Sequence, residues 1–213
     1  MENENANKLN SLNKKGEIDR VSLPITDLKL ISNLDFNHVL NLLKLIPNFN
    51  YILNSKTGKM DSSKVLKIVN DNPPLTIIKT SNHHLVSSQK VSINSLIELG
   101  SSFIGSILGN LYLNSEIKQL STDLVKSVFI DLLPQNKNPW ISFYEASTDK
   151  TSYTYNILAL FQQNSFLFIV PITFDITVLG DKESIYQFKQ TDFATYDVKI
   201  NLVNILKVLK SFS

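Results

Sequence analysis

The chain contains no cysteine, and only six of its 213 residues are glycine. Without cysteine the fold cannot depend on disulfides, on thiolate metal sites or on a thiol nucleophile. The few glycines form neither a P-loop nor a dinucleotide-binding fingerprint, and the sequence holds no G-x-S-x-G or H-E-x-x-H motif. We therefore expect no enzymatic activity, no metal and no cofactor.

Charged side chains are also sparse, at 19% of the chain, and their formal net charge is +2. No cluster of Lys and Arg stands beside stacking aromatics, so we expect no nucleic-acid partner. The three histidines are His38, His83 and His84. Adjacent residues of a strand point to opposite faces, so His83 and His84 cannot both face one metal ion there. We interpret them as an ordinary exposed pair.

The first 20 residues, MENENANKLNSLNKKGEIDR, hold four basic and four acidic side chains and few apolar ones. They lack the apolar stretch of a secretory signal, and they cannot offset their ordering entropy alone. We expect a flexible arm or propeptide over residues 1–20 and a single domain over residues 21–213. Lys14, Lys15 and Arg20 are the candidate sites for a trypsin-like protease. A plain frayed terminus is the alternative interpretation.

Apolar residues at helical spacing predict helices over residues 35–46, 61–70, 93–113 and 115–133. In the third of these, glycines thin out one side, which would let another backbone approach closely. The spacing of Gly105 and Gly109 also matches the small-residue motif of membrane helices. The segment is marginal in length for a membrane span, so we favour a buried helix of a soluble core.

Alternation with a period of two predicts strands after Pro139, over residues 140–147, 151–162, 165–179, 184–190 and 193–202. Residues 75–92 also look extended. The short connections imply antiparallel neighbours. The last segment, NLVNILKVLKSFS from residue 201, returns to helical spacing. Helices followed by strands indicate an α+β domain in which helices cover an antiparallel sheet.

Pro171 interrupts the most apolar of the predicted strands, SFLFIVPITFDITVL. Because proline cannot donate a backbone hydrogen bond, we expect it at a sheet edge, a bulge or a strand end. It would divide the run into a fully buried part, residues 166–170, and an amphipathic part, residues 172–178.

The ordered strand segments resemble the C-terminal half of the cytolytic (Cyt) delta-endotoxins, insecticidal crystal toxins of spore-forming bacteria. The segments are KTSYTYNILALFQ, IVPITFDITV and FATYDVKINL, preceded by WISFYEAS. A weaker likeness extends back to about residue 25. The matching positions are Trp140, Phe143, Thr151, Tyr153, Tyr155, Asn156, Leu158, Val170, Pro171, Phe174, Asp175, Tyr196, Val198 and Lys199.

The resemblance implies a single α/β domain of the α+β type, with a central antiparallel sheet flanked by layers of α-helices. It also implies a protoxin that is made in the cytoplasm without a signal peptide, stored as an inclusion and activated by proteolysis. The active form would act outside the cell on phospholipid membranes, either as an oligomeric pore or by detergent-like disruption. A homodimer of the protoxin and a homo-oligomer on the membrane are the partners that the resemblance suggests. Because the chain ends at Ser213, we expect cleavage mainly in the N-terminal arm.

The candidate membrane-engaging residues lie on three predicted strands, each long enough to cross a bilayer core. They are Tyr153, Tyr155, Ile157, Phe166, Phe168, Ile172, Phe174, Ile176, Val178, Tyr196, Val198 and Ile200. The alternative function is a non-lytic module on the same scaffold that binds lipid or acts as a synergist of another toxin. The sequence does not specify the target organism, the lipid preference, the stoichiometry or the cleavage site.

Overall fold

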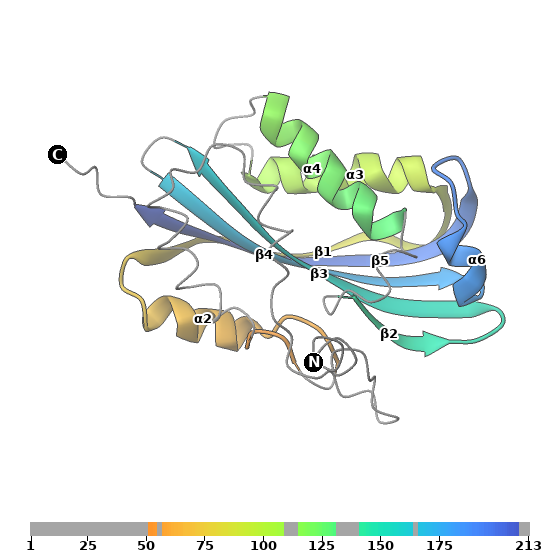
Figure 1. Ribbon diagram of the computed structural model, residues 1–213, viewed down its shortest axis with the longest axis horizontal. Helices are drawn as coiled ribbons and strands as arrows, with labels where there is room; N and C mark the ends of the chain where they lie inside the picture. Colours follow the sequence, from red (N-terminus) through yellow and green to blue (C-terminus); the bar gives the residue numbers. More distant parts are fainter. Residues whose placement is uncertain (1–50, 55–56, 109–114, 131–140, 164–165, 209–213) are drawn as a thin grey trace, which may run out of the picture. The chain divides into compact units, whose positions relative to one another are not determined.

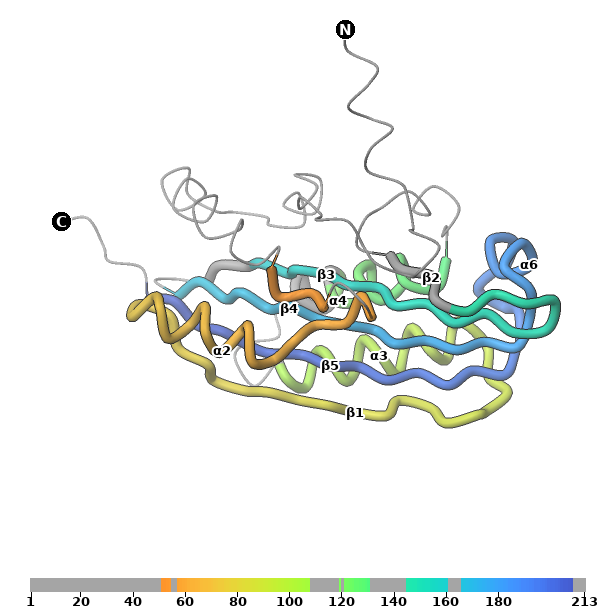
Figure 2. The backbone as a smooth tube through the Cα atoms, turned by 90° about the horizontal axis from the view of Figure 1, so that it is seen from below, coloured from red at the N-terminus to blue at the C-terminus, as the bar shows by residue number. Residues whose placement is uncertain are grey.

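The computed structural model describes residues 51–54, 57–108, 115–130, 141–163 and 166–208. The N-terminal arm, with Lys14, Lys15 and Arg20, lies outside these residues, as does the helix expected at 35–46. Five strands form one antiparallel sheet in the order β1-β5-β4-β3-β2 (Figures 1 and 2). The strands are β1 (Leu75–Ser92), β2 (Ile141–Ala146), β3 (Lys150–Gln163), β4 (Phe166–Leu179) and β5 (Phe193–Val208). The helices are α2 (Ser62–Asn70), α3 (Ile93–Leu108), α4 (Ser115–Phe129) and α6 (Lys182–Tyr186). The predicted α+β class is confirmed.

The chain forms two compact units, and β1, β3, β4 and β5 each contribute residues to both. The first unit contains the described residues up to Ser81, Asn156–Thr173 and the end of β5 from Leu202. The second unit contains Asn82–Tyr155 and Phe174–Asn201. Each long strand therefore serves two different packing environments along its length.

The first unit is built on α2. The helix begins after Asp61, whose side chain accepts a hydrogen bond from the Ser63 backbone N–H at 3.0 Å. Val65 and Val69 lie one helical turn apart, and both are buried. They pack against Ile52, which precedes the helix in the chain, and against side chains from the four strands of the unit. The core contains Ile52, Val65, Val69, Leu75, Leu158, Leu160, Leu167, Ile169, Val203 and Ile205.

The second unit is built on α3 and α4. A Cβ added at Gly100 of α3 would lie 2.8 Å from Cγ1 of Val125 on α4, so these helices approach closely there. The expectation that glycine lets a neighbour come close is confirmed at this position. Among the described residues, no heavy atom lies within 4 Å of a Cβ added at Gly105. Gly109 lies outside the described residues.

The prediction of a strand over residues 184–190 is wrong, because the chain forms the short helix α6 at Lys182–Tyr186. Asp181 accepts hydrogen bonds from the backbone N–H of Ser184 at 2.9 Å and from its hydroxyl at 2.7 Å. This local capping begins a helical turn, and Ile185 anchors the turn because it is buried. A segment of seven residues is too short for the spacing of its apolar residues to distinguish a strand from a helix.

The helical structure that the spacing after residue 201 indicates is also wrong, because β5 continues to Val208. Residues 209–213 lie outside the described chain. Four consecutive residues, Leu202 to Ile205, are buried. A strand that is buried on both faces gives a continuous apolar run, and such a run fits a helix as well as a strand.

Pro171 lies neither at a sheet edge nor at a strand end, so of the three expected positions only a bulge remains. It is buried inside β4, which continues from Phe166 to Leu179 and lies between β5 and β3 in the sheet. The proline removes one N–H donor, and the other backbone groups of β4 remain available to both neighbours. Phe166 is 42% exposed, so the fully buried part of the run begins at Leu167. The amphipathic character after Ile172 is confirmed, since Asp175 and Thr177 are only half-buried.

Candidate functional site

The twelve candidate membrane-engaging residues lie on three neighbouring strands, β3, β4 and β5, with eight in the second unit and four in the first. Eleven of them are buried, and Phe166 is the exception. Burial in this form means that none of the eleven is ready to contact a membrane without rearrangement. The candidate cleavage sites Lys14, Lys15 and Arg20 lie outside the described residues.

In the second unit, β3, β4 and β5 alternate between apolar and polar residues over residues 152–155, 174–178 and 196–201. Tyr153 and Tyr155 of β3, for example, flank Thr154, and β4 and β5 show the same alternation. The apolar set continues with Phe174, Ile176, Val178, Tyr196, Val198 and Ile200, and the polar set contains Ser152, Thr154, Asp175, Thr177, Asp197, Lys199 and Asn201. Since successive side chains of a strand point to opposite faces, this part of the sheet has one apolar side and one polar side.

The end of α4 covers the apolar side. Tyr153 donates a hydrogen bond from its hydroxyl to the backbone carbonyl of Val128 at 3.0 Å. The ring of Phe129 makes edge-on contacts with the rings of Phe174 and Tyr196, with centroids 6.4 and 6.2 Å apart. Burial raises the pKa of both Tyr153 and Tyr196 above that of an exposed tyrosine. These phenols therefore stay neutral and act as apolar bodies with one polar tip.

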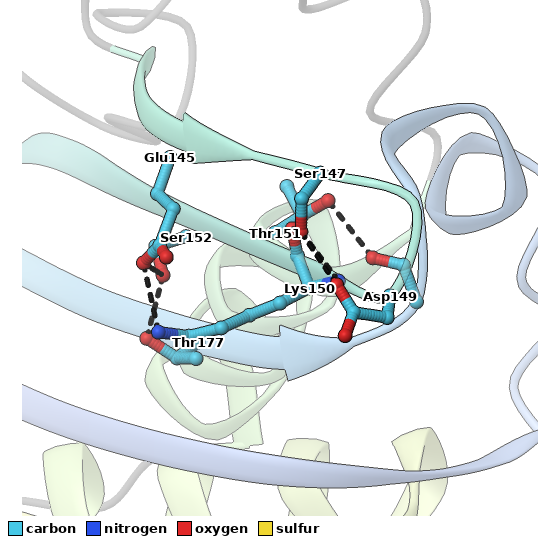
Figure 3. A network of polar contacts seen from close by, with 8 residues as sticks. Glu145, Ser147, Asp149, Lys150, Thr151, Ser152 and Thr177 are labelled. Carbon is cyan, nitrogen blue, oxygen red and sulfur yellow. Dashed lines mark hydrogen bonds and ion pairs between the residues drawn. The ribbon is translucent and has the colours of Figure 1, made fainter.

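The polar side carries a hydrogen-bonded network, which Figure 3 shows at the turn between β2 and β3. The hydroxyls of Ser152 and Thr177 lie 2.9 Å apart, and Ser152 donates to Glu145 at 3.2 Å. Lys150 forms an ion pair with Glu145 at 2.8 Å. This hydrogen-bonded ion pair lowers the pKa of the Glu145 carboxyl. Glu145 in this network is exposed, whereas Ser152 and Thr154 are buried, so water reaches only part of the polar side.

In the first unit, by contrast, β3 and β4 carry apolar residues on both sides. Leu167 and Ile169 of β4 enter the core around α2, while the alternate residues Phe168, Val170 and Ile172 are buried too. The candidate residues Ile157, Phe166, Phe168 and Ile172 belong to this unit. The strands are thus amphipathic over one part of their length and apolar on both sides over the rest.

Two polar residues interrupt this apolar region, and sequence reasoning did not single them out as site residues. Asn156 of β3 donates from its side-chain amide to the backbone carbonyl of Gly58 at 2.7 Å. Its amide oxygen accepts from the hydroxyl of Thr173 of β4, also at 2.7 Å. Thr173 in turn accepts from the backbone N–H of Met60 at 3.3 Å. The signal that could have found them is that they continue the alternation of Ser152, Thr154, Asp175 and Thr177.

The histidine pair makes two separate contacts, as expected for an ordinary exposed pair. The ring of His83 stacks on Phe103 with centroids 4.6 Å apart. Nε2 of His84 lies 3.0 Å from Oδ1 of Asp197. Within the described ranges, no group of three or more His, Asp and Glu side chains is arranged to hold a metal ion.

A cavity of about 560 Å³ lies beside α2 and is lined by Tyr51, Lys64, Lys67, Ile68, Asp71 and Asn72. Lys64 donates to the backbone carbonyl of Leu53 at 3.0 Å. Asn72 donates to the backbone carbonyl of Ile68 at 2.7 Å. Both side chains thus stabilise the surrounding backbone, and the lining shows no arrangement of nucleophile and base.

Comparison with known proteins shows a consistent likeness. The profile of the family described as Bacillus thuringiensis toxin matches residues 15–213. The Type-2Bb cytolytic delta-endotoxin of Bacillus thuringiensis subsp. jegathesan is 27% identical over 195 residues, which are 90% of this chain and 74% of the relative. The Type-2Aa cytolytic delta-endotoxin of subsp. kyushuensis is 31% identical over 152 residues, which are 70% of this chain and 58% of the relative.

A solved structure shows the same fold. It is the activated Cyt2Ba monomer from Bacillus thuringiensis subsp. israelensis, with a TM-score of 0.77 and 26% sequence identity. The alignment covers 84% of this chain and 96% of that one. In the described part of this chain, no helix has the length and apolar character needed to cross a bilayer.

Proposed function

Because the chain belongs to the Bacillus thuringiensis toxin family, among the cytolytic delta-endotoxins, we propose that it binds phospholipid bilayers and permeabilises them. The observation that carries this proposal is the one-sided apolar character of β3, β4 and β5 in the second unit. Its relatives are named as cytolytic delta-endotoxins, and the family likeness favours direct action on lipid without enzymatic chemistry.

Strand length and apolar area are sufficient for such a role. A tilted strand of about 9 to 11 residues crosses a bilayer core, and β3, β4 and β5 contain 14, 14 and 16 residues. Moving Ile172, Phe174, Ile176 and Val178 out of water would gain on the order of 6 to 12 kcal/mol. These four side chains are already buried in the described form. The exchange therefore needs the covering helices to leave.

The backbone sets a condition on the lipid-bound form. Inside a bilayer every backbone N–H and C=O needs a hydrogen-bond partner, and the five-stranded sheet has two edges, β1 and β2. A pore would require several copies that pair these edges. Monomers that lie on the surface would instead disturb lipid packing. Oligomerisation is thus a requirement of the pore mechanism and not of the detergent-like mechanism.

We propose further that the protein is stored as a protoxin inclusion inside the producing cell and that cleavage near Lys14, Lys15 or Arg20 activates it. A protoxin homodimer and a membrane homo-oligomer are the assemblies that fit this pathway. The second candidate function is a non-lytic module that binds lipid or acts as a toxin synergist. The burial of eleven of the twelve candidate residues favours it if the helices do not release.

Release of a self-quenched dye from phosphatidylcholine vesicles tests the function, with the protein measured before and after limited trypsin digestion. We expect leakage at micromolar protein, faster after digestion. Dextrans of graded size separate a pore, which has a sharp size limit, from a detergent-like action, which has none. Co-sedimentation of the protein with vesicles without leakage would favour the non-lytic module. No leakage from either form would contradict the cytolytic function.

A further inference from the structure

We propose that Asn156 and Thr173 form a latch that fastens residues 57–60 and the adjoining helix α2 to β3 and β4, and that this latch must open before the strands engage a membrane. We use the name strand latch for Asn156, Thr173, Gly58 and Met60. The inference rests on the proposed lytic function and names the contact that regulates it.

The hydrogen bonds of the strand latch form a continuous path within the first unit. Gly58 accepts from Asn156, Asn156 accepts from Thr173, and Thr173 accepts from Met60. Asn156 is 4% exposed and Thr173 is 1% exposed, so water does not compete with these bonds. Two side chains on neighbouring strands therefore hold two backbone groups of a segment about 100 residues away in sequence.

The segment that they hold leads directly into α2. Leu53 and Met60 form a β-bridge, and the Asp61 N–H donates to the carbonyl of Ile52 at 2.7 Å. Asp61 is itself the N-cap of α2. Movement of residues 57–60 away from the strands would thus pull on the first turn of the helix that covers the core of this unit.

The chemistry of the strand latch differs from that of its surroundings. The neighbouring positions toward α2 are Leu158, Leu160, Leu167 and Ile169, all in the apolar core. Apolar residues in place of Asn156 and Thr173 would also fill this space, but they could not bond the carbonyl of Gly58 or the N–H of Met60. A buried polar group without a hydrogen-bond partner lowers the stability of the fold. The four groups of the strand latch are therefore stable while they bond one another, and losing one of them leaves its partner unpaired.

Asn156 and Thr173 would also have a role after residues 57–60 have moved away from the strands. Asn156 follows Ser152 and Thr154 at alternate positions of β3, and Thr173 precedes Asp175 and Thr177 at alternate positions of β4. Residues at alternate positions share one side of a strand. Released from the segment, Asn156 and Thr173 would extend the polar side of the strands. The latch is therefore a contact that can be exchanged for water without leaving apolar groups exposed at these positions.

The test compares Thr173→Val, which removes the hydroxyl at constant shape, with Thr173→Ser, which keeps it. Thr177→Val is the matched control, because Thr177 lies on the same strand and bonds Ser152 instead of the segment. Hydrogen exchange of a peptide covering residues 57–72 reports how often α2 opens. We expect Thr173→Val to accelerate this exchange about tenfold or more, with wild-type exchange in Thr173→Ser and Thr177→Val.

Vesicle leakage is measured on the same four proteins after the same trypsin treatment, with circular dichroism as the check that each is folded. Leakage by Thr173→Val should be several-fold faster than that of the wild type and of both other variants. Faster exchange with wild-type leakage would show that the latch holds α2 but does not limit lysis, which would overturn the proposal. Unchanged exchange in Thr173→Val would overturn the latch itself.

A covalent version of the latch gives the opposite effect and does not depend on loss of stability. The chain has no cysteine, so the double variant Met60→Cys/Thr173→Cys can be joined selectively by a short thiol-reactive cross-linker with a cleavable disulfide. We expect the cross-linked protein to stop leaking vesicles and the reduced protein to recover, while Met60→Cys alone responds to neither treatment. Undiminished leakage from the cross-linked protein would overturn the proposal. If the wild type never leaks, the proposed function fails, and the exchange measurements still decide whether the latch exists.

Discussion

Asn156 and Asn204 are two buried asparagines of the first unit that differ in their hydrogen bonds. Asn156 makes two hydrogen bonds of 2.7 Å, whereas neither amide atom of Asn204 has a hydrogen-bond partner in the described part of the chain. Asn204 is 0% exposed. An unpaired buried amide reduces the free energy of unfolding, while a paired one does not.

The same substitution should therefore have opposite effects at the two positions. Leucine has the branched shape of asparagine without its polar atoms, so Asn204→Leu should raise the free energy of unfolding by about 1 to 3 kcal/mol. Asn156→Leu should lower it by about 1 to 3 kcal/mol, because it strands the Gly58 carbonyl and the Thr173 hydroxyl. Urea unfolding followed by tryptophan fluorescence measures both. Two changes of the same sign would contradict this difference in bonding.

The Glu145 carboxyl is a residue whose pKa predicts a pH dependence. The hydrogen-bonded ion pair with Lys150 lowers this pKa below the ordinary value of 4.5. A lowered pKa in the folded state means that the group stabilises the fold above its unfolded pKa and loses this contribution as the pH falls through the folded pKa. The wild type should thus be more stable than Glu145→Gln at pH 7.

This advantage of the wild type should begin to shrink as the pH falls below about 4.5, the ordinary value, and should disappear below the lowered pKa of the folded state, where the carboxyl is protonated in both states. Thermal unfolding of both proteins between pH 7 and pH 3 measures it. Because Glu145 is exposed, the difference should also shrink at high salt. A difference between the two proteins that stays constant with pH would show that the ion pair does not act through the charge of Glu145.

The helix α3 offers two glycines whose surroundings differ. At Gly100 a Cβ would lie 2.8 Å from Val125, whereas at Gly105 such a Cβ has no neighbour within 4 Å in the part of the chain that the structure describes. Gly100→Ala should lower the free energy of unfolding by about 1 to 3 kcal/mol, because the added methyl overpacks the contact with α4. Gly105→Ala should raise it by up to about 1 kcal/mol, because alanine favours the helix.

Thermal unfolding of the two variants tests this difference, and the double variant Gly100→Ala/Val125→Ala serves as its control. Removing the valine methyls gives the new Cβ room, so the two changes together should destabilise less than the sum of the separate effects. Strict additivity would show that the Gly100 side of α3 does not touch α4 in solution.

Sequence periodicity predicts best those elements that bury one side and expose the other, such as α2. The helix at Ser62–Asn70 was predicted from its apolar spacing close to its observed bounds, whereas the strand at Leu75–Ser92, which is mostly exposed, was predicted from its Thr, Ile, Val and Ser content. The errors fall where the period carries no information. Residues 202–205 are buried on both sides of the strand, and the turn at Lys182–Tyr186 depends on capping by Asp181. In these places tertiary burial or local hydrogen bonding decides the structure, and neither is visible in a periodic pattern.

The candidate site was predictable to a similar extent. Alternation along β4 identified Phe174, Ile176 and Val178 correctly as one buried set. The strand latch was not predictable, because Thr173 and Asn156 act on backbone groups of residues 58 and 60. A contact between a side chain and a backbone group more than 95 residues away has no signature in the local sequence.

The molecule as a whole should resist trypsin once its N-terminal arm has been trimmed. Cleavage near Lys14, Lys15 or Arg20 should leave a core of roughly 21 to 22 kDa, because a folded domain shields its interior sites. Mass spectrometry of a digestion time course measures this core. Denatured protein digested in parallel is the control, since it should be cut at most of its lysines. Degradation of the native protein to small peptides would contradict a compact protoxin.

The part of β4 around Leu167 and Ile169, apolar on both sides, determines how long an opened molecule would survive in water. If α2 leaves while no bilayer is near, the strands would offer other copies a flat, uncharged surface of high β-propensity, which is the composition of aggregating segments. Once α2 has left, binding of the strands to lipid would compete with their association with other copies of the chain. Preparations activated far from vesicles should lose potency with time, and more quickly at higher protein concentration, so the useful lifetime of the toxin would depend on where it is activated.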